Sequence, residues 1–201
     1  MIKILLYIVF GYNFDTLYIS DHSKLYGDIT YYDIASIEGC TYEFIVPGRI
    51  SGPTIGTGLD IGAMGKRNIK LIFKDIVSDS VLNILLTADG VRGNMAKIWI
   101  RKNNISITKY QAVRLSNRLI KYYWKPLSKR YTCVDTMKQS AKLGILSYAI
   151  HVGSLYRIKK ALSSCNYMNI ASAITKDDRN TSRREVEAFL IMAPRYEDIK
   201  R

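Results

Sequence analysis

Two carboxylates and one hydroxyl, those of Glu38, Asp60 and Thr54, occur close together in the chain, and several glycines lie between them. Paired carboxylates can divide general acid–base work, because one can hold a proton while the other stays ionised. The same residue types are also ordinary structural choices, since a helix end often carries a solvated glutamate, threonine favours strands and aspartate favours turns. Taken one at a time, these residues favour the structural interpretation. Their joint spacing favours chemistry.

The residues around this group predict the elements that hold it. Residues 34–37 are mostly apolar and predict a short helical turn, which ends at Gly39 because glycine adopts the left-handed cap conformation at little cost. Residues 41–46 alternate in character and predict a strand before Pro47-Gly48. A second extended run covers residues 53–60. We therefore expect a hairpin beside a helix end, with both carboxylates and the hydroxyl facing one cleft.

Three features of this stretch together resemble a known family. They are the pair Glu38-Gly39, the run SGPTIGTGLDIG that begins at Ser51, and the six-residue step from Thr54 to Asp60. This pattern resembles the muramidase domain of the pesticin family and, more distantly, the phage-type lysozymes. Many phage lysozymes carry the aspartate before the threonine and a histidine after the last glycine of TIGxG, where this chain has Leu59. The pesticin-like branch is therefore the better match.

The resemblance implies an α+β, lysozyme-like fold, with a small β-hairpin lobe packed on a mainly helical lobe. It also implies cleavage of the glycan strands of peptidoglycan, with Glu38 as general acid, Asp60 as the carboxylate that activates or stabilises, and Thr54 as the hydroxyl that positions water. Such a hydrolysis needs a protonated carboxyl at the leaving oxygen and a second, ionised one. Apolar neighbours of Glu38 are expected to help it keep its proton by desolvation, while Asp60 in its glycine-rich strand stays solvated and charged.

The length of 201 residues suits one domain, with 48% hydrophobic and 23% charged residues as in a globular protein. We expect a single lysozyme-like domain over residues 1–201. Its parts are an N-terminal segment (1–32), a catalytic helix end with the β-hairpin lobe (33–65) and a basic helical lobe (66–201). No run approaches the length of a membrane-spanning helix. The apolar stretch at residues 4–10 favours a buried first element, and an export or arrest signal and the truncated start of a longer protein are the alternatives.

Helical periodicity predicts four helices in the basic helical lobe, residues 66–201. Their predicted positions are a segment through Val81–Leu86 that stops at Asp89-Gly90, a helix opened by a Thr108/Gln111 capping box that ends before Pro126, a helix opened by Thr136/Gln139, and a helix opened by Ser182/Glu185 that ends before Pro194. The closing run at residues 182–190 also looks like the sequence that packs the last helix in pesticin-like and phage lysozymes. A contact of Arg183 and Arg184 with substrate anions is the alternative.

The net charge of +13 is unevenly distributed. Residues 1–60 carry seven acidic and three basic residues, a net of −4, so residues 61–201 carry +17. A region of this charge is expected to attract polyanions, such as peptidoglycan peptides or other anionic envelope polymers. A basic nucleic-acid-binding module and a merely solvated surface are the alternatives, although no specific nucleic-acid motif accompanies the charge.

Cysteines and histidines are few. Three cysteines (Cys40, Cys133 and Cys165) leave room for at most one internal disulfide, and whether a pair forms stays open. His22 and His151 stand apart from any CxxC pair, so we expect neither a metal site nor a cofactor.

The resemblance also bears on the biological setting. A phage endolysin, a secreted effector and a bacteriolytic toxin would each act in the bacterial periplasm or cell wall, and a toxin would be matched by a cognate immunity or inhibitor protein. A catalytically inactive glycan-binding domain is a further alternative. Glu38→Gln is the change that separates an enzyme from these alternatives.

Overall fold

The computed structural model describes residue 29 and residues 31–193. Helices dominate it, together with one small antiparallel sheet, which confirms the expected α+β, lysozyme-like architecture. The helices are α2 (Tyr31–Glu38), α3 (Lys66–Phe73), α4 (Asp79–Leu85), α5 (Gly93–Asn103), α6 (Lys109–Arg130), α7 (Gln139–Val152), α8 (Lys159–Ser164), α9 (Tyr167–Thr175) and α10 (Thr181–Met192). Three 3₁₀ turns complete the helical structure: η1 (Leu86–Ala88), η2 (Thr132–Thr136) and η3 (Tyr156–Ile158).

The sheet has the order β1-β2-β3, with β1 at Thr41–Ile45, β2 at Thr54–Gly56 and β3 at Leu59–Asp60. The expected second extended run is therefore folded back on itself. Gly56 and Gly58 have φ values of 63° and 91°, a region that favours glycine, and they allow the chain to reverse between β2 and β3. The reversal pairs Thr54 with Asp60 across the two strands.

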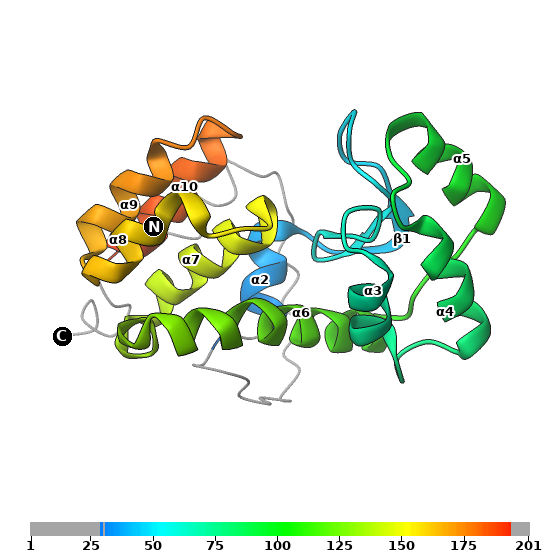
Figure 1. Cartoon of the computed structure of the whole chain (residues 1–201), viewed down its shortest axis with the longest axis horizontal. Coiled ribbons are helices and arrows are strands. Elements are labelled where there is room, and N and C mark those ends of the chain that lie inside the picture. Colours follow the sequence, from blue (N-terminus) through cyan, green and yellow to red (C-terminus); the bar gives the residue numbers. More distant parts are fainter. Residues whose placement is uncertain (1–28, 30, 194–201) are drawn as a thin grey trace.

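Helix α6 runs along the length of the molecule and lies beneath the elements at both ends of the molecule (Figure 1). The sheet lies at one end with α3, α4 and α5, and α7–α10 gather at the other end with α2 (Figure 1). Contacts of α6 with β2 and α3 on one side, and with α2 and α7 on the other, connect the two groups. The division of the chain at residue 65 stays a prediction.

Helix α6 confirms the predicted capping box. The Thr108 hydroxyl accepts from the backbone N–H of Gln111, and the Gln111 side chain accepts from the backbone N–H of Thr108. The predicted end before Pro126 is wrong, because the helix continues to Arg130 with Pro126 inside it. Burial of Trp124 and Leu127 on either side of the proline offsets the backbone hydrogen bond that proline cannot make.

Two other predicted helix starts are shifted. Thr136 ends the 3₁₀ turn η2, where its hydroxyl donates to the carbonyl of Cys133 (2.8 Å), and α7 begins three residues later. Ser182 is the second residue of α10, which begins after Asn180 in the left-handed conformation (φ 56°). The α10 end at Met192 and the α4–η1 end before Asp89 agree with the predictions.

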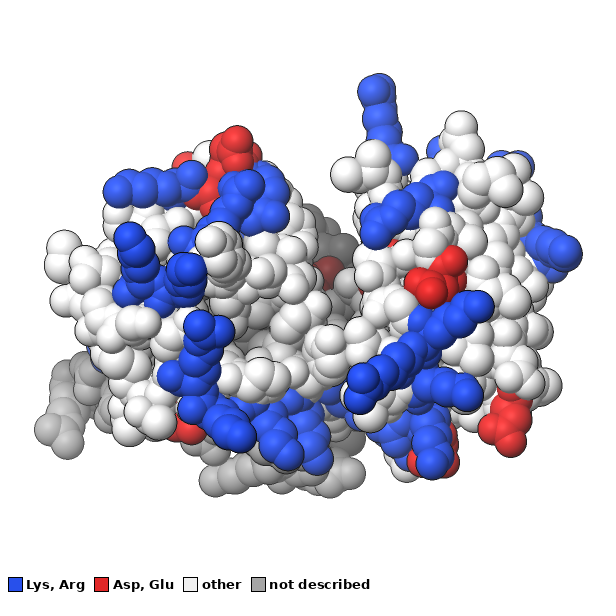
Figure 2. All heavy atoms as spheres, viewed as in Figure 1, with Lys and Arg blue, Asp and Glu red and all other residues white. Residues whose placement is uncertain are grey.

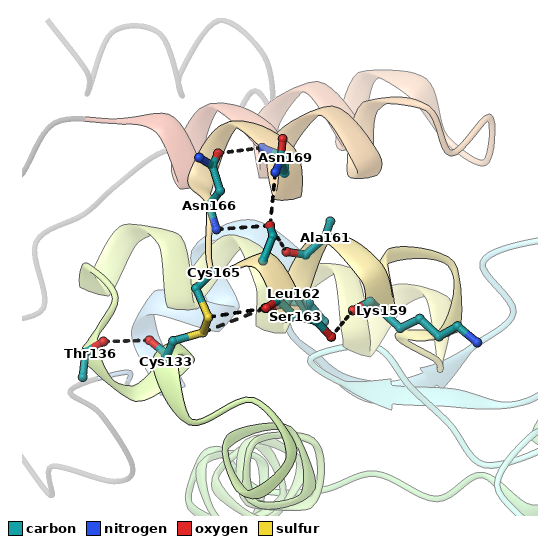
Figure 3. Close-up of a disulfide and its surroundings, with 10 residues drawn as sticks. Cys133, Thr136, Lys159, Ala161, Leu162, Ser163, Cys165, Asn166 and Asn169 are labelled. Atoms are coloured by element: carbon teal, nitrogen blue, oxygen red, sulfur yellow. Dashed lines mark hydrogen bonds between the residues drawn. A yellow bond between two sulfur atoms is a disulfide. The ribbon is translucent and has the colours of Figure 1, made fainter.

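A disulfide joins Cys133 in η2 to Cys165, the residue that follows α8 (Figure 3). It connects the α6–α7 junction to the α8–α9 junction, two parts of the chain separated by 32 residues. Among the described residues, no helix is long and apolar enough to cross a membrane. The apolar run at residues 4–10 lies outside the described residues.

Candidate active site

Glu38 is the last residue of α2, where the chain leaves the helix toward β1. Gly39 follows with a φ of 69°, and its N–H donates to the carbonyl of Ala35 (3.0 Å), so the predicted glycine cap is confirmed. The side chain of Glu38 is only 4% exposed. Burial of a carboxyl to this degree requires polar partners, and they come from the far end of the chain.

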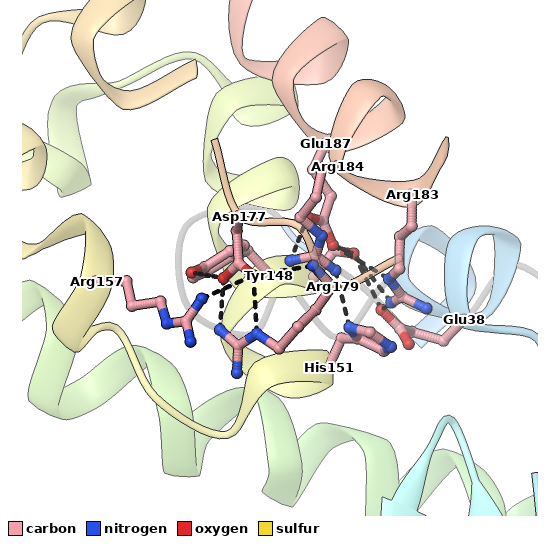
Figure 4. A network of polar contacts seen from close by, with 10 residues as sticks. Glu38, Tyr148, His151, Arg157, Asp177, Arg179, Arg183, Arg184 and Glu187 are labelled. Atoms are coloured by element: carbon pink, nitrogen blue, oxygen red, sulfur yellow. Dashed lines mark hydrogen bonds and ion pairs between the residues drawn. The ribbon is translucent and has the colours of Figure 1, made fainter. Parts of the chain in front are cut away.

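Those partners hold Oε1 of Glu38. The Ser147 hydroxyl on α7 donates to this oxygen at 3.0 Å, and Nη2 of Arg183 on α10 forms an ion pair with it (Figure 4). The other oxygen, Oε2, faces the sheet, since a Cβ added at Gly58 would lie 3.5 Å from it. One oxygen is therefore fixed by the helices, and the other is directed toward the β2–β3 turn.

A second buried carboxylate, that of Glu187, shares these partners. Its Oε1 lies 2.9 Å from Oγ of Ser147 and accepts from Nε of Arg183 (3.1 Å), and its Oε2 lies 2.9 Å from Nη1 of Arg184. The side chains of Glu187 and Arg184 are both completely buried. Burial raises the pKa of Glu187, and the two arginines act against that rise.

Arg184 extends the network to α7. Its Nη2 contacts Nδ1 of His151 at 2.8 Å, and its guanidinium lies 4.8 Å from the centre of the Tyr148 ring (Figure 4). Burial, together with the charge of Arg184, lowers the pKa of His151. The neutral imidazole can therefore accept the hydrogen bond from Arg184.

Behind Tyr148 lies a separate charged group centred on Asp177. Tyr148 donates to Oδ2 of Asp177 at 2.7 Å, and Arg157 and Arg179 form ion pairs with the same carboxylate. Burial and the hydrogen bond to Asp177 raise the pKa of Tyr148 to about 12. This group fixes the segment between α9 and α10, and thereby the start of the helix that carries Arg183.

Asp60 lies in β3 and is held by backbone donors. Its Oδ2 accepts from the N–H of Gly52 (3.0 Å), and its Oδ1 accepts from the N–H of Ala63 (3.1 Å). Gly52 has no room for a side chain, because a Cβ there would lie 2.4 Å from Oδ1 of Asp60 and 2.6 Å from Cα of Gly62. The glycines in this stretch therefore bring backbone close to the carboxylate.

Thr54 belongs to the same local structure as Asp60. Its hydroxyl is buried and donates to the carbonyl of Gly52 (3.1 Å), the residue whose N–H binds Asp60. The structure therefore brings Thr54 and Asp60 together through Gly52 and through their pairing in the sheet. It brings Glu38 to the same sheet only at its turn, beside Gly58.

The surface is hollowed between the sheet end and the α7–α10 end of the molecule (Figure 2). Lys and Arg side chains border this hollow and gather along the edge formed by α6 (Figure 2). Arg114, Arg118, Lys121 and Lys125 recur at helical spacing on one face of α6, and we call them the α6 stripe. Arg118 is fixed to α3, because its Nη1 donates to the carbonyl of Ile72 (3.0 Å).

Residues 45–161 match the family Pesticin, described as bacterial toxin homologue of phage lysozyme, C-terminal part. The chain belongs to the Pesticin family. The family assignment and the lysozyme-like fold inferred from the sequence are thus confirmed. No curated protein matches the chain. The matched residues include Thr54 and Asp60, whereas Glu38 precedes them and Arg183 follows them, so the roles predicted for the three site residues stay predictions.

Ser147 and Glu187 are polar members of the site that the sequence did not reveal. Ser147 lies in a nearly continuous apolar stretch of α7, where a single serine is easily taken as a small core residue. Glu187 follows Arg183 by four residues, which is the usual spacing of an exposed helical ion pair. The sequence did contain one signal of this network, the pair Arg183-Arg184. Arg183 binds Glu38, and the side chain of Arg184 is buried.

Proposed function

We propose that this Pesticin-family chain is a muramidase that hydrolyses glycosidic bonds in the glycan strands of peptidoglycan. The observation that supports this most directly is the state of Glu38. Its carboxyl is almost completely buried, Oε1 is fixed by Ser147 and Arg183, and Oε2 faces the turn of the sheet. A carboxyl fixed on one side and directed outward on the other is suited to donate a proton at a defined point.

In the proposed reaction, the carboxyl group of Glu38 donates its proton to the glycosidic oxygen as the bond between that oxygen and the sugar carbon breaks. Asp60 stays ionised and either activates the attacking water or stabilises the positive charge that develops on the sugar. Two backbone N–H groups bind its oxygens and fix the direction of the carboxyl group. The Thr54 oxygen retains lone pairs that can accept a hydrogen bond from water.

The proposed setting follows from the family description, a bacterial toxin related to phage lysozyme. Peptidoglycan is the substrate, so the chain acts in the bacterial periplasm or cell wall after delivery or release. An inhibitor protein that occupies the hollow between the sheet end and the α7–α10 end is part of this proposal, and its test is whether the product of a neighbouring gene abolishes lysis. If no neighbouring product inhibits, the inhibitor is withdrawn.

The test compares the purified chain with Glu38→Gln on isolated peptidoglycan, with released fragments identified by mass spectrometry. The proposal expects muropeptides that end in reducing N-acetylmuramic acid, and their loss in Glu38→Gln. Glu185→Gln is the matched control, since it removes the same charge from the exposed face of α10. An undiminished rate in Glu38→Gln would show that Glu38 is not the acid, and a different reducing sugar would show another bond specificity.

A further inference from the structure

The Ser147 hydroxyl lies between two carboxyl groups. Its Oγ is 3.0 Å from Oε1 of Glu38 and 2.9 Å from Oε1 of Glu187, and Nη2 of Arg183 lies 3.2 Å from the same Oγ. Glu38 comes from α2, Ser147 from α7 and the other two residues from α10. Three elements that are distant in the chain thus meet at one hydroxyl group.

A serine hydroxyl has one hydrogen to donate and two lone pairs to accept with. Arg183 donates to Oγ, which uses one lone pair, and the single hydrogen can go to only one of the two carboxyl groups. If both were ionised, the other contact would bring two oxygens within about 3 Å with no hydrogen between them. Both contacts are satisfied only when one carboxyl carries a proton and donates it to Oγ.

The charges around the pair come from two helices. On α10, Arg183 contacts both carboxyl groups, and Arg184 forms an ion pair with Glu187. On α7, His151 accepts a hydrogen bond from Arg184. Two guanidinium groups therefore stabilise negative charge on the pair, while nearly complete burial opposes it.

The segment between α9 and α10 contributes charges at longer range. Asp177 and Arg179 lie on the far side of the Tyr148 ring, against which Arg184 packs. Asp177 and Arg179 form an ion pair, so their opposite charges largely cancel at the position of Glu187.

We propose that Glu38 and Glu187 share one proton through Ser147, and that Glu187 is the positioning residue that keeps Glu38 protonated for catalysis. In the transfer, the O–H bond of Glu187 breaks as a new O–H bond forms on Ser147, and the original O–H bond of Ser147 breaks as one forms on Oε1 of Glu38. One proton thus moves from Glu187 to Glu38, and Ser147 is unchanged. The proposal rests on the proposed role of Glu38 as general acid.

The first test is the pH dependence of kcat/KM on soluble peptidoglycan fragments. A shared proton is difficult to remove, because its loss leaves two neighbouring negative charges. Glu187→Gln removes one of them, so the alkaline limb should move to lower pH by about one unit, with the rate on the acid side largely kept. Ser147→Ala should move it in the same direction, and Ser147→Thr, which keeps a hydroxyl, should restore it. Glu185→Gln on the same helix should leave it in place.

An alkaline limb that stays in place in Glu187→Gln would overturn the sharing of the proton. A fall in kcat/KM by the same factor at every pH, with no shift of the limb, would overturn it as well. Such results with an inactive Glu38→Gln leave the proposed function standing, whereas an active Glu38→Gln overturns the proposed function itself. Carbon-13 NMR titration of the glutamate carboxyl groups in the full chain needs no activity and no folded Glu187→Gln. The expected result is that the Glu38 and Glu187 signals both change in the same two pH steps. Independent single steps would overturn the sharing.

Discussion

Gly52 donates its backbone N–H to Oδ2 of Asp60 at 3.0 Å, and it does so at a position where no other side chain fits. The two residues approach because β2 and β3 are short strands that bring the segment before Thr54 against the end of β3. The position of the Asp60 carboxylate therefore depends on the small size of Gly52, which has no side chain that could take part in a reaction.

Gly52→Ala should displace Asp60. The added Cβ would lie 2.4 Å from Oδ1 of Asp60 and 2.6 Å from Cα of Gly62, an overpacking that costs about 1–3 kcal/mol. We expect a loss of peptidoglycan hydrolysis on the order of 100-fold, as for a displaced catalytic group, together with a lower Tm. Gly48→Ala is the control, because its Cβ would meet only the movable Ser51 hydroxyl (3.1 Å). Equal activity in both variants would contradict a requirement for Gly52.

Gly58→Ala tests the approach of the β2–β3 turn to Glu38. Its φ of 91° strains any other residue, and the added Cβ would stand 3.5 Å from Oε2 of Glu38. Gly56→Ala suffers a similar strain at φ 63° but meets nothing within 4 Å. Both variants should lose about 1–2 kcal/mol of unfolding free energy, measured by denaturant titration. Only Gly58→Ala should also raise KM, and a matching rise in Gly56→Ala would assign the effect to strain.

The disulfide should contribute substantially to stability. Its two cysteines are separated by 32 residues, and closing a loop of this size stabilises a protein by about 3–4 kcal/mol. The double change Cys133→Ser with Cys165→Ser, or reduction of the native chain, should lower the unfolding free energy by about that amount. Cys40→Ser leaves the disulfide in place and serves as the control. An unchanged Tm on reduction would show that the disulfide does not stabilise the folded chain.

Asp177 should make stability depend on acid pH. Hydrogen bonds from Arg179 lower the pKa of Asp177 well below its ordinary value, outweighing the effect of burial, and Tyr148 adds to the lowering. Because the folded pKa is depressed, the stabilisation is present above the unfolded pKa of about 3.9 and is lost as pH falls toward the folded value.

Asp177→Asn should therefore cost about 3 kcal/mol at pH 7, as expected for one broken member of a buried ion pair. The gap in Tm between the variant and the native chain should narrow as pH falls below about 4. Asp178→Asn, whose side chain is 90% exposed, is the control. A gap that stays constant with pH would contradict the role of the Asp177 charge.

The α6 stripe should promote attraction to anionic wall material. Lys121→Glu with Lys125→Glu reverses two exposed charges, so lysis of intact walls should fall several-fold at low salt and less at high salt. Arg101→Glu with Lys102→Glu makes the same change in net charge on α5. If both double variants behave alike, net charge rather than the stripe determines attraction.

Local signals in the sequence predicted much of the fold and part of the site. Gly39 marked the end of α2, the Thr108/Gln111 pair marked the start of α6, and the glycines around Thr54 marked a compact β segment. Each of these signals depends on a few neighbouring residues. The predicted helix end before Pro126 was wrong. Trp124 and Leu127 flank the proline and are buried, and their burial depends on tertiary contacts that a local sequence rule does not include.

The surroundings of Glu38 could not be predicted in the same way. Ser147 and Arg183 bind it from positions 109 and 145 residues further along the chain, and single-sequence periodicity has no information on such contacts. The bend between β2 and β3 was also missed. Residues 53–60 were expected to form one extended run, whereas Gly56 and Gly58 adopt positive φ values and reverse the chain within it.

The separation of Glu38 and Arg183 by 145 positions also bears on synthesis. A ribosome makes α2 and the sheet before it makes α10, so a nascent chain holds Glu38 without the helix that fixes its carboxyl. The surroundings of Glu38 become complete only after α10 has been translated. The producing cell therefore makes the proposed proton donor before it makes the arginine that binds it.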